Sequence, residues 1–281
     1  MKFANQSGRF VVLHPGGGVV DVETASKGAF GPSPADVFPV WREFTQWLAS
    51  ASLSPTGPLV TEQLDAPSPR PPQVFGVGLN YSSHVDEGGF SLPDSPLTFT
   101  KFPSSVTGPT GDITITGPQV DWEVELVVVI GETVNAVKAE DAWDVVAGVT
   151  LGQDVSDREA QNRPKQFPQF SLGKSRPGFS PIGPFLVTPD ELADRDNIEL
   201  ACSVNGEQVQ KGHTQSLIFS VAALIEYLSG LVTLLPGDLI FTGTPPGVGA
   251  TMDPPRFLAD GDILVSTSPE LGQMRHRFVA P

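Results

Sequence analysis

The segment DWEVELVVVIG occupies residues 121–131 and is the most informative part of the chain for its fold. Its second half, Val127 to Ile130, is a continuous β-branched and apolar run, which predicts a buried strand. Residues two apart along a strand share a face, so Glu123 and Glu125 point the same way. Two carboxylates side by side at the edge of a core are costly unless they share a proton or a cation. The segment therefore indicates half of a site for a hard divalent metal, with an edge strand whose glutamates face solvent as the competing interpretation.

The overall composition narrows the class of protein. The chain has 281 residues and a formal net charge of −15, which argues against nucleic acid and against anionic membrane surfaces as partners. Its single cysteine, Cys202, excludes a disulfide framework and a CxxC metal site. The N-terminus lacks the apolar core of a signal peptide, and no run approaches the ~20 apolar residues of a membrane span. A cytoplasmic location is the default expectation.

The residue pattern predicts many strands and few helices. Apolar residues recur on one helix face in residues 36–50, and two further helices are expected at 139–147 and 216–229, each ending at a glycine. The dipeptide Asn205-Gly206 is a strong signal for a tight hairpin. Strands are expected at residues 74–79, 113–115, 123–130, 149–155, 198–204, 207–209, 239–242, 263–266 and 274–279. Without regular βαβ alternation, the pattern favours a mainly β member of the α+β class over a Rossmann or barrel fold.

Residues 54–72 are rich in Pro, Ser and Thr, which is typical of a linker. We therefore expect a small N-terminal α+β domain with its linker in residues 1–70, and a main, catalytic domain in residues 71–281. A turn is expected where Pro181-Ile182-Gly183-Pro184 interrupts the later part of the chain.

Three further segments join the acidic strand: NYSSHVDE at 80–87, QDVSDR at 153–158 and PGDLIFTGTPPGVG at 236–249. In order and spacing, the four segments resemble the fumarylacetoacetate hydrolase family, from about Pro72 to the C-terminus. The resemblance implies a mixed β-sandwich roll that usually pairs as a homodimer. It also implies a metal-dependent enzyme acting on a small oxo-acid, with no other cofactor.

The carboxylate ligands indicate which metal ion the site would bind. Carboxylates suit Mg²⁺ or Mn²⁺, which keep several waters, whereas zinc prefers nitrogen and sulfur ligands. By the resemblance, the third ligand beside Glu123 and Glu125 is Asp154. Asp121 is a rival, because it lies two residues before Glu123 on the same predicted strand face.

The resemblance also implies catalytic and substrate-binding residues. His84 and Glu87 lie three residues apart, so Glu87 can orient the His84 imidazole as a general base. Lys174 would stabilise an oxyanion that develops as water attacks a carbonyl. Arg158 faces the substrate in this interpretation, with an ion pair to Asp154 as the alternative. The expected substrate-binding residues are Tyr81, Lys101, Arg158, Gln161 and Thr244.

The expected metal ligands and catalytic residues support hydrolysis of a carbon–carbon bond in a 1,3-dicarbonyl compound, an acylpyruvate such as fumarylpyruvate. His84 would deprotonate water, and a metal-chelated enolate would leave. Oxaloacetate decarboxylation, or hydration or isomerisation of a 2-oxo-dienoate, on the same metal is the alternative. A catalytically silent metal-binding dimer is the alternative from another class. The basic residues between 158 and 176 could steer an anionic substrate towards the metal.

Overall fold

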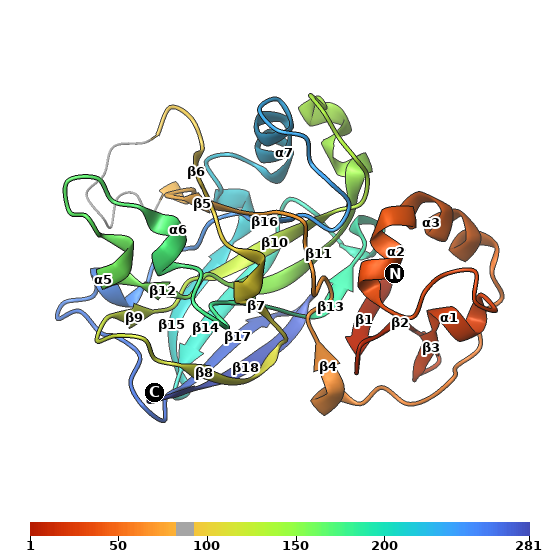
Figure 1. Ribbon diagram of the computed structural model, residues 1–281, viewed down its shortest axis with the longest axis horizontal. Coiled ribbons are helices and arrows are strands. Elements are labelled where there is room, and N and C mark those ends of the chain that lie inside the picture. The colour runs from red at the N-terminus through yellow and green to blue at the C-terminus, as the bar shows by residue number, and fades with distance from the viewer. Residues whose placement is uncertain (83–92) are drawn as a thin grey trace.

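The computed structural model describes residues 1–82 and 93–281. Its largest element is an eleven-stranded sheet (Figure 1). The path through this sheet runs in the order β3 (Val19–Asp21), β2 (Arg9–Leu13), β1 (Lys2–Gln6), β13 (Ser180–Val187), β11 (Val146–Gln153), β10 (Val124–Ile130), β16 (Leu239–Phe241), β5 (Val74–Gly78) and β6 (Leu97–Thr100). Off this path, β4 (Leu64–Asp65) pairs with β1, and β7 (Val106–Thr107) pairs with β13.

A second sheet of five strands packs against the first through the main core. Its order is β15 (Glu207–His213), β14 (Glu199–Val204), β17 (Ile263–Ser268), β18 (Gly272–Val279) and β8 (Thr110–Thr114). A short two-stranded ladder, formed by β12 (Ser156–Asp157) and β9 (Val120–Asp121), lies beside them. The expected mainly β member of the α+β class, built as a mixed sandwich, is confirmed.

Helices are short and lie at the ends and sides of the sheets (Figure 1). The α-helices are α1 (Val22–Ala25), α2 (Pro34–Val37), α3 (Trp41–Ser50), α5 (Arg158–Gln161), α6 (Phe170–Gly173) and α7 (Val221–Ser229). The 3₁₀ turns are η1 (Phe38–Val40), η2 (Thr61–Gln63), η3 (Pro103–Ser105), η4 (Ala139–Val145), η5 (Pro189–Glu191), η6 (Thr214–Ser216) and η7 (Gly249–Thr251). Within residues 1–82 and 93–281, no helix is both long and apolar enough to cross a membrane.

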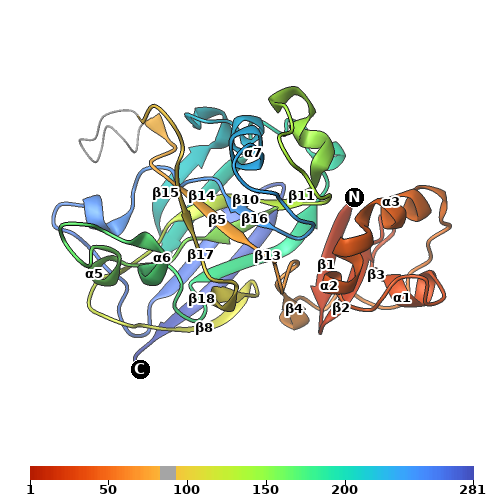
Figure 2. The same ribbon diagram turned by 45° about the horizontal axis from the view of Figure 1, so that its top comes forward.

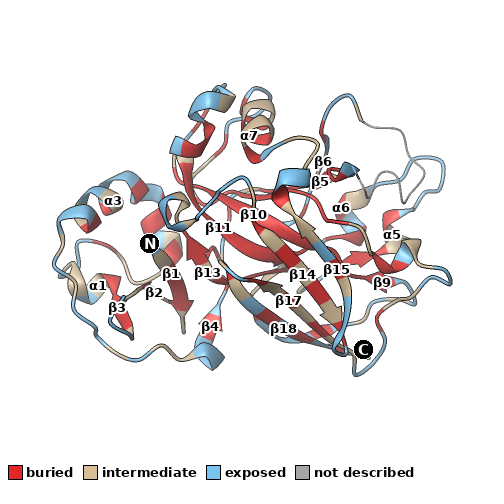
Figure 3. Ribbon diagram, turned by 180° about the vertical axis from the view of Figure 1, so that it is seen from behind, coloured by how far each residue is buried: buried red, intermediate tan, exposed pale blue. Residues whose placement is uncertain are grey.

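Strand β10 is buried on both faces, which explains its unbroken apolar sequence (Figure 3). Leu126 and Val128 belong to the core shared with the second sheet and α7. Val127 and Val129, on the other face, belong to a core shared with the N-terminal elements. Residues 123 and 125 have the same parity as Val127, so their carboxylates lie on the face towards the N-terminal elements, at the point where the strand begins.

The N-terminal elements form a lobe beside the main body (Figure 2). An aromatic cluster of Phe3, Phe10, Trp41 and Phe44 fills this lobe, with ring centroids 5.3 Å apart for Phe3 and Phe10. Strand β1 also pairs with β13, so the first strands continue the main sheet. The division of the chain near residue 70 stays a prediction, and the described linker region includes η2 and β4.

Two local expectations from the sequence are wrong, and the helices expected at 36–50 and 216–229 are shorter, as α3 (Trp41–Ser50) and α7 (Val221–Ser229). Residues 139–147 are not one helix, because η4 gives way to β11 at Val146. Gly148 lies inside this strand, where an added Cβ would come within 2.8 Å of Leu186 Cδ1, so it serves close packing rather than a helix end. Residues 181–184 are not a turn but part of β13. The hairpin at Asn205-Gly206 is confirmed, with φ of 52° and 83°.

Candidate metal centre and active site

Three carboxylates meet where β10 begins and β11 ends. Glu123, Glu125 and Asp154 each offer one oxygen, and these oxygens lie within 4.8 Å of one another. The antiparallel register brings them together, because Val124 pairs with Gln153 and the amide of Asp154 donates to the Glu123 carbonyl at 2.9 Å. All three side chains belong to buried residues. Such a cluster of like charges requires a proton or cations nearby.

Glu125 is held by the chain just after β16, the neighbour of β10 on the side opposite β11. Its Oε2 accepts a hydrogen bond from the backbone amide of Gly243 at 2.8 Å, just after β16. Gly243 has φ of 104°, and an added Cβ would lie 2.8 Å from Asn80 Cβ, so only glycine fits this approach. Burial, followed by the charges of Asp154 and Glu123, raises the pKa of Glu125 well above its usual range.

Two lysines neutralise the cluster. Lys174 Nζ donates to Glu123 Oε2 at 2.8 Å and to Asp154 Oδ2 at 2.5 Å. Lys101 Nζ donates to Asp154 Oδ1 and, at 3.0 Å, to the carbonyl of Phe179. Burial lowers the pKa of Lys101, whereas the pKa of Lys174 is raised because the carboxylates of Asp154 and Glu123 outweigh its burial.

Arg158 orients Glu123 rather than pairing with Asp154. Its NH1 lies 2.6 Å from Glu123 Oε1, and its Nε and NH2 donate to Asp121 Oδ2 at 2.9 and 2.7 Å. Asp121 also accepts from the backbone amides of Trp122, Gly249 and Ala250. Asp121 is therefore committed to a structural network, and it is not a member of the carboxylate cluster.

The cluster fits a hard divalent ion. Three carboxylate oxygens at the edge of a core are the ligand chemistry of Mg²⁺ and Mn²⁺. Lys174 now contacts two of the three carboxylates, so its ammonium balances charge that a bound ion would share. Across residues 1–82 and 93–281, no other group of three metal-ligating side chains meets this spacing.

A cavity of about 430 Å³ opens onto the carboxylates. Four of the expected catalytic and substrate-binding residues line it, namely Arg158, Gln161, Lys174 and Thr244, together with the expected metal ligands Glu123 and Glu125. Thr244 Oγ1 donates to the Val124 carbonyl at 2.9 Å and Gln161 Oε1 accepts from Arg158 at 3.1 Å, so their positions are fixed.

Two expected substrate-binding residues lie behind the cavity wall instead. Lys101 and Tyr81 are each 1% exposed and are not among the lining residues. Burial and the charge of Glu125 raise the pKa of Tyr81, whose hydroxyl has no partner in the described part of the chain. Their contact with substrate stays a prediction. His84 and Glu87 fall outside the described residues, so their roles also stay predictions.

Sequence reasoning missed the apolar wall of this cavity. Leu97, Phe99, Phe170 and Val248 line it, although none carries a chemical signature. Apolar side chains that bind a ligand look like core residues in a sequence, and only the alternation of β6 could have indicated that Leu97 and Phe99 share a face.

Comparison with known families agrees with the geometry. The sequence model described as fumarylacetoacetate (FAA) hydrolase C-terminal matches residues 73–279. The chain belongs to the fumarylacetoacetate hydrolase family. The match begins with β5 and ends with β18, and it includes all three carboxylates. Members of this family with known reactions are enzymes, which include hydrolases, isomerases and tautomerases.

Two curated members of the fumarylacetoacetate hydrolase family are similar to this chain. The mitochondrial oxaloacetate tautomerase Fahd2a of Rattus norvegicus is 41% identical over 269 residues, covering 94% of this chain and 85% of the relative. The 2,4-didehydro-3-deoxy-L-rhamnonate hydrolase of a Sphingomonas strain is 42% identical, covering 73% of this chain and 72% of the relative. The two names describe different reactions at similar identity.

Solved structures extend the likeness over the whole chain. A protein from Mycobacterium smegmatis aligns over 100% of this chain and 99% of its own, with 49% identity and a TM-score of 0.95. The maleylpyruvate hydrolase of Sphingobium sp. SYK-6, solved with manganese(II) and pyruvate, aligns over 100% of this chain and 99% of its own. It is 26% identical, with a TM-score of 0.78. Its manganese is consistent with a divalent metal at the buried carboxylates here.

Proposed function

We propose that this protein is a divalent-metal-dependent hydrolase that cleaves a carbon–carbon bond in an acylpyruvate. The observation that carries the proposal is the buried trio Glu123, Glu125 and Asp154 beside Lys174, at the cavity that Lys174 also lines. A bound Mg²⁺ or Mn²⁺ would polarise the carbonyl oxygens of a chelated 2-oxo acid. The chain's own residues then have to place water and hold the charge that develops.

The atoms of the reaction balance without a further reactant. The oxygen of water bonds to the distal carbonyl carbon, and the bond from that carbon to the neighbouring CH₂ breaks. The CH₂ regains a proton, which leaves a carboxylic acid and pyruvate. We assign to Lys174 the stabilisation of the negative charge on the attacked carbonyl oxygen, and the position of its ammonium at the cavity, beside two carboxylates, supports this role. The water-activating role is assigned to His84, with Glu87 as its orienting partner, on the sequence motif alone.

Keto–enol tautomerisation of oxaloacetate is the second candidate. The relative named oxaloacetate tautomerase at 41% identity favours it. Tautomerisation needs the same polarised 2-oxo acid and a proton carrier, but no attacking water. The hydrolase of similar identity and the manganese- and pyruvate-bound hydrolase structure favour hydrolysis.

A substrate panel separates the two candidates. Acetylpyruvate, fumarylpyruvate and oxaloacetate are supplied to the Mn²⁺-loaded protein, to EDTA-treated protein and to His84→Ala. We expect metal-dependent hydrolysis with the highest kcat/KM for an acylpyruvate, and a loss of ~10²–10⁴-fold in His84→Ala, since a general base contributes about that much. His14→Ala is the matched control. A higher kcat/KM for oxaloacetate tautomerisation, unaffected by His84→Ala, would replace the proposal with the second candidate.

A further inference from the structure

The cavity is lined by carboxylates at its buried end and by apolar side chains at its solvent end. At the inner end, Glu123 and Glu125 are 7% and 1% exposed. Towards solvent the lining includes Leu97, which is 41% exposed, together with the half-buried Phe99 and Phe170. One smaller apolar residue, the exposed Ala250, completes this outer wall, which we define as Leu97, Phe99, Phe170 and Ala250.

The outer wall is built into the sheet. Register pairs Phe99 with Gly76 and Leu97 with Gly78 between β6 and β5. An added Cβ at Gly76 would lie 2.4 Å from the Phe99 ring, so the ring rests directly on the β5 backbone. The ring of Phe170, on α6, packs edge-on against Phe99 at 5.6 Å between centroids. The ring of Phe99 is therefore held between a strand backbone and a second ring.

Phe99 also joins the wall to the charged centre. The ammonium of Lys174 lies 5.2 Å from the centroid of its ring, on the side of the carboxylates. A 2-oxo acid held at the carboxylate cluster would thus have the aromatic wall next to it, and whatever follows its reacting carbons would meet apolar side chains.

The lining cations of the described chain are already paired. Arg158 is held by Asp121 and Glu123, and Lys174 by Glu123 and Asp154. Residues 83–92, outside the described part, read SHVDEGGFSL and contain no lysine or arginine. A carboxylate placed against the outer wall would give up part of its hydration without gaining a charged partner, which is unfavourable.

We infer that the outer wall binds an uncharged, apolar tail, so that the substrate is a monoanionic 2-oxo acid with an alkyl or aryl acyl group. This inference rests on the proposed function in one respect, that a 2-oxo acid binds at the carboxylate cluster. Substrates whose second carboxylate lies beyond the reacting carbons, as in a fumaryl tail, are disfavoured.

Binding of unreactive probes tests the tail directly. Two 2-oxo acids of six carbons, 2-oxohexanoate and 2-oxoadipate, differ only in a terminal methyl against a terminal carboxylate. We expect calorimetry on the Mn²⁺-loaded protein to give 2-oxohexanoate at least about tenfold tighter binding than 2-oxoadipate. Pyruvate, which has no tail, should bind more weakly than 2-oxohexanoate. Equal or tighter binding of 2-oxoadipate would overturn the inference.

Introducing a positive charge at the wall supplies the matched variants. Phe170→Arg should shift the preference towards 2-oxoadipate by about tenfold or more, because the new guanidinium pairs with its terminal carboxylate. Leu97→Arg should do the same if Phe170→Arg folds poorly. Leu172→Arg, on the same helix, is the control, since Leu172 is 64% exposed and does not line the cavity. A shift in the control as large as in Phe170→Arg would count against the wall as the tail site.

These measurements are independent of turnover. If 2-oxohexanoate binds preferentially but no acylpyruvate is hydrolysed, the proposed function fails and the tail site stands. If acylpyruvates are hydrolysed but the two probes bind equally, only the tail site fails.

Discussion

Each carboxylate of the buried trio is held by a different set of donors. Glu125 accepts from the Gly243 amide, Asp154 from two ammoniums, and Glu123 from Lys174 and Arg158. Groups that hydrogen-bond a metal ligand fix its orientation and tune its basicity. The donors therefore hold three like charges together in a geometry that a divalent ion could use.

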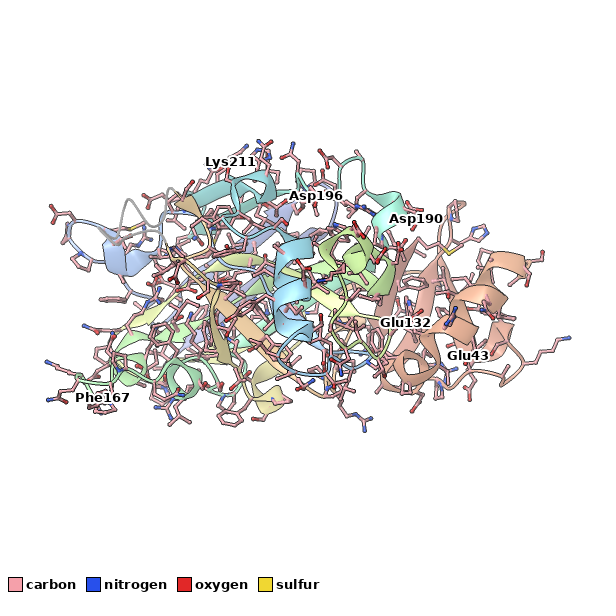
Figure 4. All side chains as sticks on the ribbon, turned by 90° about the horizontal axis from the view of Figure 1, so that it is seen from above. Glu43, Glu132, Phe167, Asp190, Asp196 and Lys211 are labelled. Atoms are coloured by element: carbon pink, nitrogen blue, oxygen red, sulfur yellow. The ribbon has the colours of Figure 1, made fainter. Side chains whose placement is uncertain are left out.

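Removing a carboxylate charge should weaken metal binding. We expect Glu125→Gln and Asp154→Asn each to lower the Mn²⁺ affinity measured by calorimetry by about a hundredfold, at least as much as losing a supporting partner. Glu43→Gln makes the same charge change on the exposed face of α3, in the N-terminal lobe (Figure 4), and should bind Mn²⁺ as the unmutated protein does. Unchanged affinity in both site variants would show that the trio is not the metal site.

Arg158 should act through Glu123 and not through the substrate. We expect Arg158→Met to lower the Mn²⁺ affinity by about 10- to 100-fold, because Glu123 would lose its orienting partner. Asp121→Asn should have an effect in the same direction, since Asp121 holds the other edge of the guanidinium. Arg163→Met is the control, because Arg163 pairs with Glu159 on the surface. A raised KM with unchanged Mn²⁺ affinity would instead place Arg158 on the substrate.

Among the elements, β18 carries a buried titratable group that the site does not use. His276 is 1% exposed, and its Nε2 lies 3.0 Å from the carbonyl of Gly108, just before β8. The β8 strand pairs in parallel with β18 alongside it. Burial lowers the pKa of His276 to about 4, against the favourable contact with that carbonyl. The imidazole is therefore neutral in the folded protein at neutral pH.

This burial predicts a loss of stability in acid. Because the folded pKa of about 4 lies below the usual 6.5, the unfolded chain binds a proton first as pH falls. The free energy of unfolding should fall between about pH 6.5 and pH 4, by up to about 3 kcal/mol. His276→Gln should flatten this dependence, as measured by urea unfolding across the range, whatever its own stability at pH 7. Equal slopes for the variant and the unmutated protein would contradict the assignment.

The whole molecule is acidic, and most of the basic residues near the site are paired with carboxylates. Outside the carboxylate cluster, Arg163 pairs with Glu159, and Arg176 lies 3.7 Å from Asp157. The basic residues between 158 and 176 therefore offer less free charge for substrate steering than their sequence suggests. Phe167, 80% exposed in the same region, lies at the end of the molecule opposite Glu43 (Figure 4). Pairing of two such molecules as a homodimer stays a prediction.

Metal should stabilise the entire fold, because the trio joins β10 and β11 at the centre of the main sheet. A ligand that binds only the native state at about 100 times its Kd adds about 2.7 kcal/mol to the free energy of unfolding. We expect Mn²⁺ to raise the Tm of EDTA-treated protein, and Glu125→Gln to lose most of that increase. The same Tm with and without Mn²⁺ in the unmutated protein would mean that the ion binds weakly or elsewhere.

Much of the fold could be predicted from the sequence because its signals are local. The apolar run of β10, the hairpin at Asn205-Gly206 and the amphipathic pattern of α3 each depend on neighbouring residues only. Glu123 and Glu125 share a face for the same reason. Strand β13 could not be predicted in this way, because Pro181 and Pro184 signal a turn, and only its partners β1, β7 and β11 make it a strand.

The sequence by itself determined the family, the acidic strand and the chemistry that carboxylates offer to a divalent ion. The resemblance already named Asp154 as the third ligand, but only the tertiary structure shows why Asp154 and not Asp121 joins the two glutamates. Asp154 joins the trio through the register of β10 and β11, while Asp121, nearer in sequence, is bound by Arg158 and three backbone amides. The apolar wall likewise depends on strand pairing, because packing between distant residues leaves no local pattern in the chain.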